Sequence, residues 1–232
     1  MTHSQNRLLA LFPANVMAAL EPHLKVVELT FADVVAEAGS AIKRVYFPHS
    51  GVISLVVELS HGEVIETAMI GRYGALNATS ALDGKMSLNK GIVQLAGMAS
   101  VIDADQVRRV ADQQPALRSL LIRHEQVLFA EAQQSAACNA SHAVEPRMCR
   151  WLLRMRDLAG DDLTLTQDFL GQMLGVRRTS VSIVASTLQK AGFIRYRRGN
   201  IRILDVDGLR EGACECYGTV KAHYERLLEA NH

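Results

Sequence analysis

The side chains of this sequence best suited to chemistry are arginines and small hydroxyl groups in its C-terminal third. Four of them are consecutive, Arg-Arg-Thr-Ser at 177–180, and Ser182 and Ser186 follow at helical spacing. Arginine and hydroxyl donors of this kind contact phosphates and base edges in the major groove of duplex DNA. From residue 177 to 202 the chain holds seven Lys or Arg and no Asp or Glu, while the other residues include 18 basic and 24 acidic side chains. A basic segment on an acidic body is typical of a DNA-binding module joined to a different domain.

The residues from 163 to 203 predict the elements that would position these donors, a helix-turn-helix followed by a small hairpin. Thr166 is suited to cap the first helix, because its hydroxyl can accept a hydrogen bond from the first turn. Gly175 falls where two helices meet at a sharp angle and a positive φ is needed. Gly171 is small enough to let the second helix cross the first closely. The segment is therefore predicted to be a winged helix.

The wing is predicted just beyond the second helix. Gly192 ends the helical pattern, and Gly199-Asn200 joins the short strands FIRYRR and IRIL. The candidate DNA contacts on these elements are Thr166, Gln167, Arg177, Arg178, Thr179, Ser180, Ser182, Ser186, Arg195, Arg197 and Arg198. The alternative is a winged helix used only for protein contacts, with its arginines on a solvated face.

The first half of the chain predicts a β-rich sensor. Short runs rich in β-branched residues, separated by turn signals, are KVVELTF, RVYFP, GVISLVVEL, EVIETAMI, GIVQLAG and MASVID. Strands at this spacing are typical of an antiparallel barrel or jelly roll, which can hold one small ligand. Short helices are expected at 5–11 and 14–20, and a helical insert is expected at 76–82.

A long amphipathic helix is predicted from Ala116 to about Ala137, after a short one at 105–113. Its apolar stripe consists of Leu117, Leu120, Leu121, His124, Val127 and Leu128. The stripe could pack on the barrel, but its place between a sensor and a DNA reader favours pairing with a second copy as a short coiled coil. A homodimer would then present two reading helices about one turn of DNA apart.

The expected architecture is α+β, with a β-barrel (jelly roll), a long dimerisation helix and a C-terminal winged helix-turn-helix. A hinge is expected at 139–142, followed by an amphipathic helix at 145–158, and one terminal helix is expected beyond the wing. The predicted domains are a sensor at 1–115, a dimerisation helix and hinge at 116–141, and a DNA-binding domain at 142–232.

Composition and motifs argue against several other classes. With 49% apolar and 21% charged residues the chain is typical of a globular protein, and no apolar run approaches the roughly 20 residues of a membrane helix. The N-terminus has no signal-peptide pattern, so a cytoplasmic location without membrane contact is expected. No nucleophile elbow, P-loop, HExxH or dinucleotide-binding glycine motif occurs, so no enzyme is predicted. A metal enzyme built on the barrel would have to use His49, His61 and Glu63.

The four cysteines make no repeated metal-finger spacing. Cys138 and Cys149 fall in helical stretches and are predicted to be small buried residues. The pair Cys214-Glu-Cys216 could bind a metal or respond to oxidation, but the sequence alone favours neither. We therefore predict no metal and no cofactor from the sequence.

The chain resembles the Crp–Fnr family of bacterial transcription regulators, the relatives of the cyclic-AMP receptor protein. The stretch TQDFLGQMLGVRRTSVSIVASTLQKAGFI, with the hairpin behind it, carries most of the resemblance. The order of barrel, long helix and winged helix extends it over essentially the whole length. The resemblance implies a homodimer that binds a palindromic DNA site near promoters, with RNA polymerase as a further candidate partner.

The sequence departs from this family in the ligand-binding cassette. Members that bind cyclic AMP carry a Gly-Glu-x-Gly/Ala stretch and a downstream Arg-Ser/Thr-Ala. The corresponding residues here are GALN at 74–77 and NKG at 89–91, so the carboxylate and the guanidinium are both missing. The candidate ligand pocket is Gly74, Ala75, Leu76, Asn77, Asn89 and Lys90. Lys90 is a mobile point charge and a poor substitute for a bidentate arginine, so weak or no cyclic-nucleotide binding is expected.

The cofactor-binding residues of the family's other known sensors also find no clear match in this sequence. The Fnr branch uses an N-terminal cysteine cluster for an iron–sulfur centre, and none is present here. Haem sensors of the family use ligands in the barrel, for which His49 or His61 would have to serve. The effector therefore stays unidentified, and a ligand-binding module without direct DNA binding is the alternative function.

The recognition helix also differs from that of many relatives, which place Glu and Arg where this chain has Thr179 and Ile183. The resemblance implies that Arg178 contacts a guanine, an interaction worth about 1–3 kcal/mol of base discrimination. Arg177, Arg195, Arg197 and Arg198 are assigned to phosphates, which predicts affinity that falls steeply with salt. The DNA half-site should therefore differ from the usual one of the family.

Overall fold

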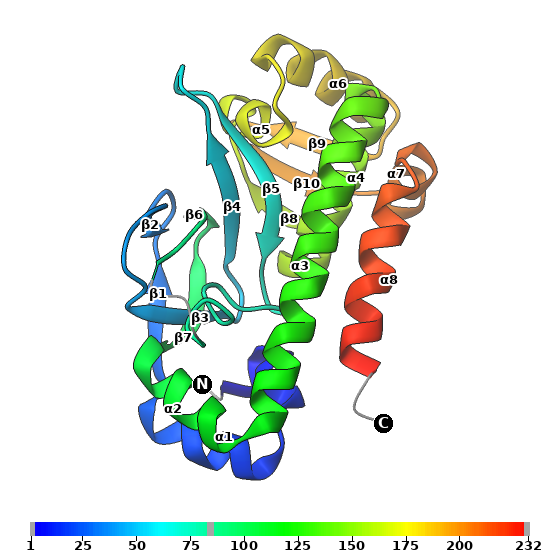
Figure 1. Cartoon of the computed structure of the whole chain (residues 1–232). Coiled ribbons are helices and arrows are strands. Elements are labelled where there is room, and N and C mark those ends of the chain that lie inside the picture. Colours follow the sequence, from blue (N-terminus) through cyan, green and yellow to red (C-terminus); the bar gives the residue numbers. More distant parts are fainter. Residues whose placement is uncertain (1–2, 83–85, 230–232) are drawn as a thin grey trace. The chain divides into compact units, whose positions relative to one another are not determined.

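The chain folds into two compact units. The structure, a computed structural model, describes residues 3–82 and 86–229 (Figure 1). The first unit comprises residues 1–55, 68–130 and 223–232, and the second comprises residues 56–67 and 131–222. Among the described residues, no helix is both long and apolar enough to span a membrane.

The first unit contains two antiparallel sheets. One has the order β1 (Lys25–Leu29), β7 (Gly97–Asp103), β3 (Arg44–Pro48). The other has the order β2 (Val34–Ala36), β6 (Lys90–Leu95), β4 (Val52–Glu58), β5 (Val64–Ile70), although the far ends of β4 and β5 belong to the second unit. The predicted barrel class is confirmed. Of these strands, β2 is the one that the sequence patterns did not identify.

Helices border these sheets. The 3₁₀ turns η1 (His3–Gln5), η2 (Leu9–Leu11) and η3 (Glu21–His23) accompany the helices α1 (Ala14–Leu20), α2 (Ala104–Gln113) and α3 (Pro115–Ser141). The single helix expected at 5–11 is wrong, because the buried Asn6 interrupts it. Its Oδ1 accepts a hydrogen bond from the Leu9 amide, and its amide donates to the Pro48 and Gly74 carbonyls.

The helical insert expected at 76–82 is also wrong. Leu76 forms an antiparallel bridge with Tyr46, and turns follow it up to residue 82. Asn77 has a positive φ of 64°, a conformation that an α-helix does not continue. The main chain pairs with β3 here instead of coiling.

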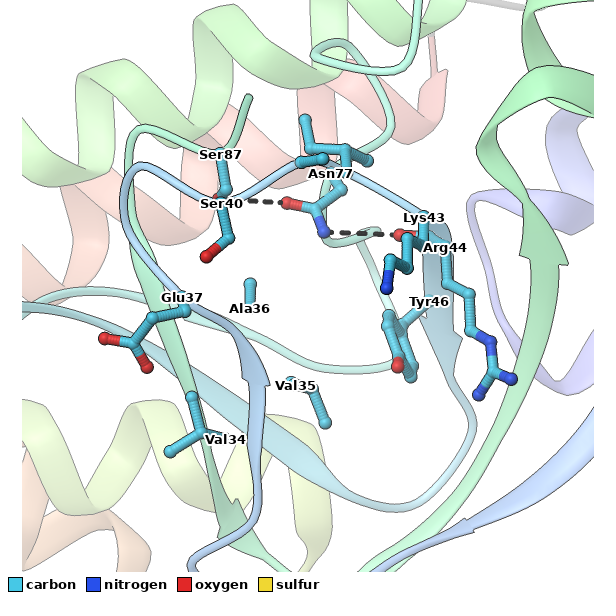
Figure 2. Close-up of a pocket in the computed structure, with 12 residues that line it drawn as sticks. Val34, Val35, Ala36, Glu37, Ser40, Lys43, Arg44, Tyr46, Asn77 and Ser87 are labelled. Atoms are coloured by element: carbon cyan, nitrogen blue, oxygen red, sulfur yellow. Dashed lines mark hydrogen bonds between the residues drawn. The ribbon is translucent and has the colours of Figure 1, made fainter. Parts of the chain in front are cut away.

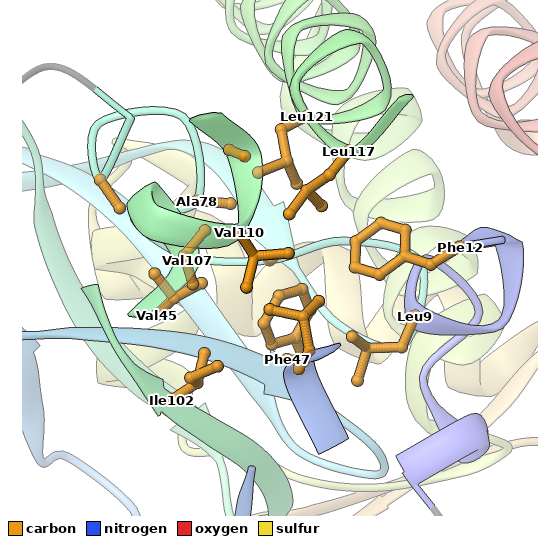
Figure 3. Close-up of a cluster of buried hydrophobic side chains, with 14 of the residues drawn as sticks. Leu9, Phe12, Val45, Phe47, Ala78, Ile102, Val107, Val110, Leu117 and Leu121 are labelled. Atoms are coloured by element: carbon orange, nitrogen blue, oxygen red, sulfur yellow. The ribbon is translucent and has the colours of Figure 1, made fainter. Parts of the chain in front are cut away.

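A large hydrophobic core of the first unit joins the N-terminal turns to β3, α2 and α3 (Figure 3). Phe12 and Phe47 meet edge to face, with ring centroids 6.3 Å apart. Leu117, Leu120 and Leu121 are fully buried here, and Val127 is partly buried beside them. Most of the stripe predicted as a dimer seam is therefore inside its own chain.

A second cluster of the same unit lies between the sheets and contains Leu29, Ile53, Val93 and Leu128. Leu128 is another residue of the predicted seam, and it is 6% exposed. The coiled-coil assignment of the stripe is thus wrong, and its packing on the barrel is the arrangement found. Burial of these side chains within one chain leaves little apolar surface on them for a second copy.

The second unit is built around α4 (Val144–Ala159). It contains β8 (Asp162–Thr164), α5 (Gln167–Leu174), α6 (Arg178–Lys190), β9 (Ile194–Arg197), β10 (Asn200–Ile203), α7 (Val206–Gly212) and the start of α8 (Cys216–Glu229). The small sheet has the order β8-β10-β9. Trp151 on α4 is buried, and its indole donates to Glu66 Oε1 on β5 at 2.8 Å.

Three local expectations for this unit are corrected. Helix α3 continues to Ser141, so residues 139–141 are helical and do not form a hinge. The wing turns at Arg198 and Gly199, with φ of 49° and 77°, because Asn200 already pairs with Arg197 and Thr164 in the middle strand. Beyond the wing, as far as residue 229, the chain forms the two helices α7 and α8 in place of one.

Candidate DNA-binding surface and sensor pocket

The helix-turn-helix forms where the glycines and the cap were expected. Thr166 Oγ1 accepts the Phe169 amide at 3.2 Å and caps α5. Gly175 ends α5 with a φ of 61°, a left-handed conformation that costs a side-chain-bearing residue energy. A Cβ on Gly171 would lie 2.9 Å from the Val176 carbonyl oxygen, so only glycine fits this crossing. The angle between α5 and α6 thus rests on two glycines and one hydroxyl.

Helix α6 presents one apolar and one polar face. Val181, Val184, Ala185 and Leu188 are buried on the inner face. The other side carries the predicted contacts, of which Arg177, Arg178, Thr179 and Ser186 are exposed and Ser180 and Ser182 are partly exposed. Ile183 is 69% exposed among them, so its side chain is available for an apolar contact with a thymine methyl group.

Side chains of α5 hold part of this face in place. Arg178 Nε lies 3.6 Å from Asp168 Oδ1, and both side chains are about two-thirds exposed. Ser182 Oγ lies 2.6 Å from Gln167 Oε1 and 3.1 Å from the Arg178 carbonyl oxygen, and its single hydrogen can be donated to either acceptor. An exposed ion pair of this kind is weak and easily replaced by a stronger partner, so Asp168 can orient Arg178 without preventing base contact.

The wing places its arginines toward solvent. Arg195, Arg197 and Arg198 are exposed, and the hairpin is attached to the helices through Tyr196. The Tyr196 hydroxyl donates to the Leu165 carbonyl at 3.2 Å, and its amide donates to Gln189 Oε1 at 2.7 Å. Burial raises the pKa of Tyr196 above its ordinary value. No sequence pattern indicated this anchoring role.

A cavity of about 530 Å³ lies in the first unit between β2, the 37–43 segment and β3 (Figure 2). Its lining includes Val34, Val35, Ala36, Glu37, Ser40, Ala41, Ile42, Lys43, Arg44, Tyr46, Asn77 and Ser87. Figure 2 shows Asn77 bonded on two sides: its amide donates to the Arg44 carbonyl at 3.2 Å, and its Oδ1 accepts from Ser87 Oγ at 3.4 Å. The sequence pattern missed Lys43 and Arg44 because neither lies in the cassette region.

The predicted ligand residues are only partly brought together. Asn77 lines the cavity, and Lys90 reaches Glu37 on its wall at 3.6 Å. Gly74, Ala75 and Leu76 are buried, and Asn89 is exposed. The assignment of these last four residues to the cavity lining is therefore corrected: they are not among its lining residues, and Ala75 and Leu76 pack into the hydrophobic clusters instead.

Gly74 and Ala75 instead face His124 of α3. The Ala75 amide donates to His124 Nε2 at 3.2 Å, which makes the ring a neutral acceptor. Burial lowers the pKa of His124 to about 4. A Cβ on Gly74 would lie 2.6 Å from the same ring nitrogen, so the glycine is needed for close approach. His124 is a buried structural group and not part of an exposed seam.

The histidines considered for haem or a metal enzyme have other surroundings. His49 Nε2 lies 2.7 Å from Ser100 Oγ, and burial lowers its pKa. His61 and Glu63 lie at the turn between β4 and β5 in the second unit. In the part of the chain that the structure describes, these three residues do not form a metal-ligand group.

Comparison with known proteins agrees with this geometry. Residues 146–211 match the model of a Crp-like helix-turn-helix domain, a span that contains α5, α6 and the wing. The fold is similar to that of FixK2 from Bradyrhizobium japonicum, with a TM-score of 0.70 and 13% identity, covering 82% of this chain and 98% of that one. Residues 146–211 are therefore a Crp-like helix-turn-helix domain, and the chain shares the fold of FixK2.

Two regulators from Thermus thermophilus are also similar in fold to this chain. One, described as a CRP-family transcriptional regulator, has a TM-score of 0.66 and 19% identity, covering 81% of this chain and 96% of its own. The other, described as CRP/FNR family, has a TM-score of 0.64 and 21% identity, covering 82% and 98%. No curated protein sequence matches the chain significantly.

Proposed function

We propose that this chain is a transcription regulator of the Crp–Fnr type, a homodimer that reads a palindromic DNA site by inserting α6 into successive major grooves. The supporting observation is the outward face of α6, where Arg177, Arg178 and Thr179 are exposed beside the exposed wing residues Arg195, Arg197 and Arg198. Arg178 would contact a guanine, and Arg177 with the wing arginines would contact phosphates. Thr166, Gln167, Ser180, Ser182 and Ser186 would complete the contact surface.

The proposed dimer face is an exposed stripe of α3. Ile122 and Phe129 are 43% and 64% exposed, and they lie seven residues apart, the repeat of a coiled coil. Large apolar side chains at this spacing favour burial against an identical helix. This stripe replaces the seam expected from the sequence, whose leucines are buried in the first unit.

The first unit would receive the signal through the cavity beside Asn77. Lys43 and Arg44 line it together with Glu37, so an effector with both anionic and polar groups fits its charge. The acidic and guanidinium groups of a cyclic-nucleotide cassette are missing from 74–77 and 89–91, which supports DNA binding independent of cyclic AMP. The proposed role is regulatory and non-catalytic, as for the transcription regulators whose fold it resembles.

Fluorescence anisotropy with DNA from upstream of the chain's own gene tests this function. Titrations are run across a salt series, with and without cyclic AMP, and against random DNA of equal length. Tight, salt-dependent binding that cyclic AMP does not change is expected. Binding only with the nucleotide would refute cyclic-AMP independence, and equal binding to random DNA would refute site-specific reading.

A further inference from the structure

Three cysteines and one histidine converge in the second unit, away from the residues assigned to DNA. Cys138 lies near the end of α3, His142 follows that helix, and Cys214 and Cys216 flank the start of α8. One ligand atom from each of the four residues lies within 4.8 Å of all the others. Cys138 Sγ is 3.5 Å from Cys214 Sγ, and Cys216 Sγ is 3.7 Å from His142 Nδ1.

These separations fit one tetrahedral metal ion. Zinc–sulfur bonds of about 2.3 Å and zinc–nitrogen bonds of about 2.05 Å place neighbouring ligand atoms roughly 3.6–3.8 Å apart. An iron–sulfur cluster inserts several atoms between its ligands, and would hold the cysteine sulfurs farther from one another. The four side chains therefore surround space for a single ion.

The partners around the ligands support the same conclusion. Glu215 Oε1 lies 3.3 Å from His142 Nε2, which leaves Nδ1 to face the thiols. A carboxylate on the second ring nitrogen is the usual way in which a metal-bound histidine is oriented. The Gln134 amide donates to Cys216 Sγ at 3.0 Å, a contact that stabilises negative charge on the sulfur.

The three cysteines of the cluster lie inside the protein. All three cysteines are buried, Cys138 completely. A divalent cation would bind these cysteines as thiolates and release their protons.

We propose that Cys138, His142, Cys214 and Cys216 bind one structural Zn²⁺ ion. Four protein ligands fill the tetrahedral positions and leave none open for substrate, as in structural sites. The ion links the end of α3 to the α7–α8 connection. This connection lies next to the start of α4, the helix on which the helix-turn-helix packs. Its role is to fix the segment that leads into α4.

Metal analysis of the purified full chain tests the site directly. Inductively coupled plasma mass spectrometry is expected to find one zinc per chain. Cys149→Ala is the matched control, because Cys149 is also buried but lies outside the cluster, and it should retain the zinc. Cys214→Ser and His142→Ala should lose it. Zinc retained by both ligand variants, or iron in its place, would overturn the assignment.

A second measurement needs no variant. Cobalt(II) added to the reduced, metal-free chain should give the absorption bands of a tetrahedral site with thiolate-to-metal charge transfer, and Zn²⁺ should abolish them. Removing the metal should lower Tm, and Zn²⁺ but not Mg²⁺ should restore it. No spectrum in the reduced protein, or a Cys138–Cys214 disulfide in its place, would refute the proposal, whatever the result for DNA binding.

Discussion

Two residues of this chain show that a single side chain can determine either the specificity of binding or the stability of the fold. Arg178 is exposed, paired weakly with Asp168, and able to exchange that carboxylate for a base edge. His124 is fully buried and accepts a hydrogen bond from the Ala75 amide. The first should therefore affect DNA recognition, and the second should affect folding.

Replacing Arg178 by Ala should relax specificity at one base pair of each half-site. The loss expected is about 1–3 kcal/mol of discrimination, as for other bidentate arginine–guanine contacts. Competition anisotropy with single-base variants of the site measures it. Lys190→Ala, at the other end of α6, serves as the control. Equal loss of affinity on specific and random DNA would assign Arg178 to a phosphate instead.

His124 should make the fold less stable in acid. Its folded pKa of about 4 lies below the unfolded value of 6.5, so the unfolded state binds more protons between these limits. The stability is complete above pH 6.5 and falls as the pH drops toward 4. By pH 5 the loss should be about 2 kcal/mol.

Denaturant unfolding at pH 7.5 and pH 5 measures this effect. His124→Gln is the matched variant, because its amide oxygen can accept the Ala75 hydrogen bond without titrating. In this variant the free energy of unfolding should depend less on pH, because the contribution of His124 is gone. The contribution of His49, whose pKa is also lowered, should remain. An unchanged pH dependence in the variant would show that His124 does not titrate as described.

At the scale of elements, the contact between α5 and α6 is set by backbone proximity. Gly171→Ala should destabilise the helix-turn-helix by about 1–3 kcal/mol, because its new Cβ would press on the Val176 carbonyl. Gly218→Ala is the control, since a Cβ there meets nothing within 4 Å and helix propensity favours alanine by about 1 kcal/mol. Thermal unfolding of both variants compares them. Equal changes in Tm for the two variants would contradict a close approach of α5 and α6 at Gly171.

Helix α3 has two apolar faces with different expected roles. Phe129→Glu should give monomers and weaken binding to the full palindrome, because the charge enters the proposed dimer face. Leu121→Glu should instead unfold the first unit, because Leu121 is completely buried there. Light scattering and circular dichroism separate the two outcomes. A Phe129→Glu protein that remains dimeric would rule out this face.

At the scale of the whole molecule, the basic segment from residue 177 to 202 is part of an otherwise acidic chain. Arg197→Ala should weaken binding to all DNA sequences alike and reduce the slope of log K against log salt by about 0.9. Arg210→Ala is the control, since Arg210 is paired with Asp207 on α7, outside the helix-turn-helix and the wing. A salt series of anisotropy titrations compares them. Loss confined to one base position would contradict the phosphate assignment.

The sequence by itself determined the elements whose signals are local. Gly175, Gly171 and Thr166 identified the helix-turn-helix, and alternating apolar residues located six of the seven strands in the first half. These signals are readable because each depends on residues within one or two turns of the chain. The basic composition of residues 177–202 likewise predicted that this surface binds DNA.

Only the tertiary structure decided which faces and which distant residues meet. The amphipathic stripe of α3 showed that one side is buried, but not whether its own barrel or a second chain covers it. The group of three cysteines and one histidine joins residues up to 78 positions apart in the sequence, Cys138 and Cys216. Such proximity depends on how elements pack, because no local pattern records the partner that a side chain will meet across the fold.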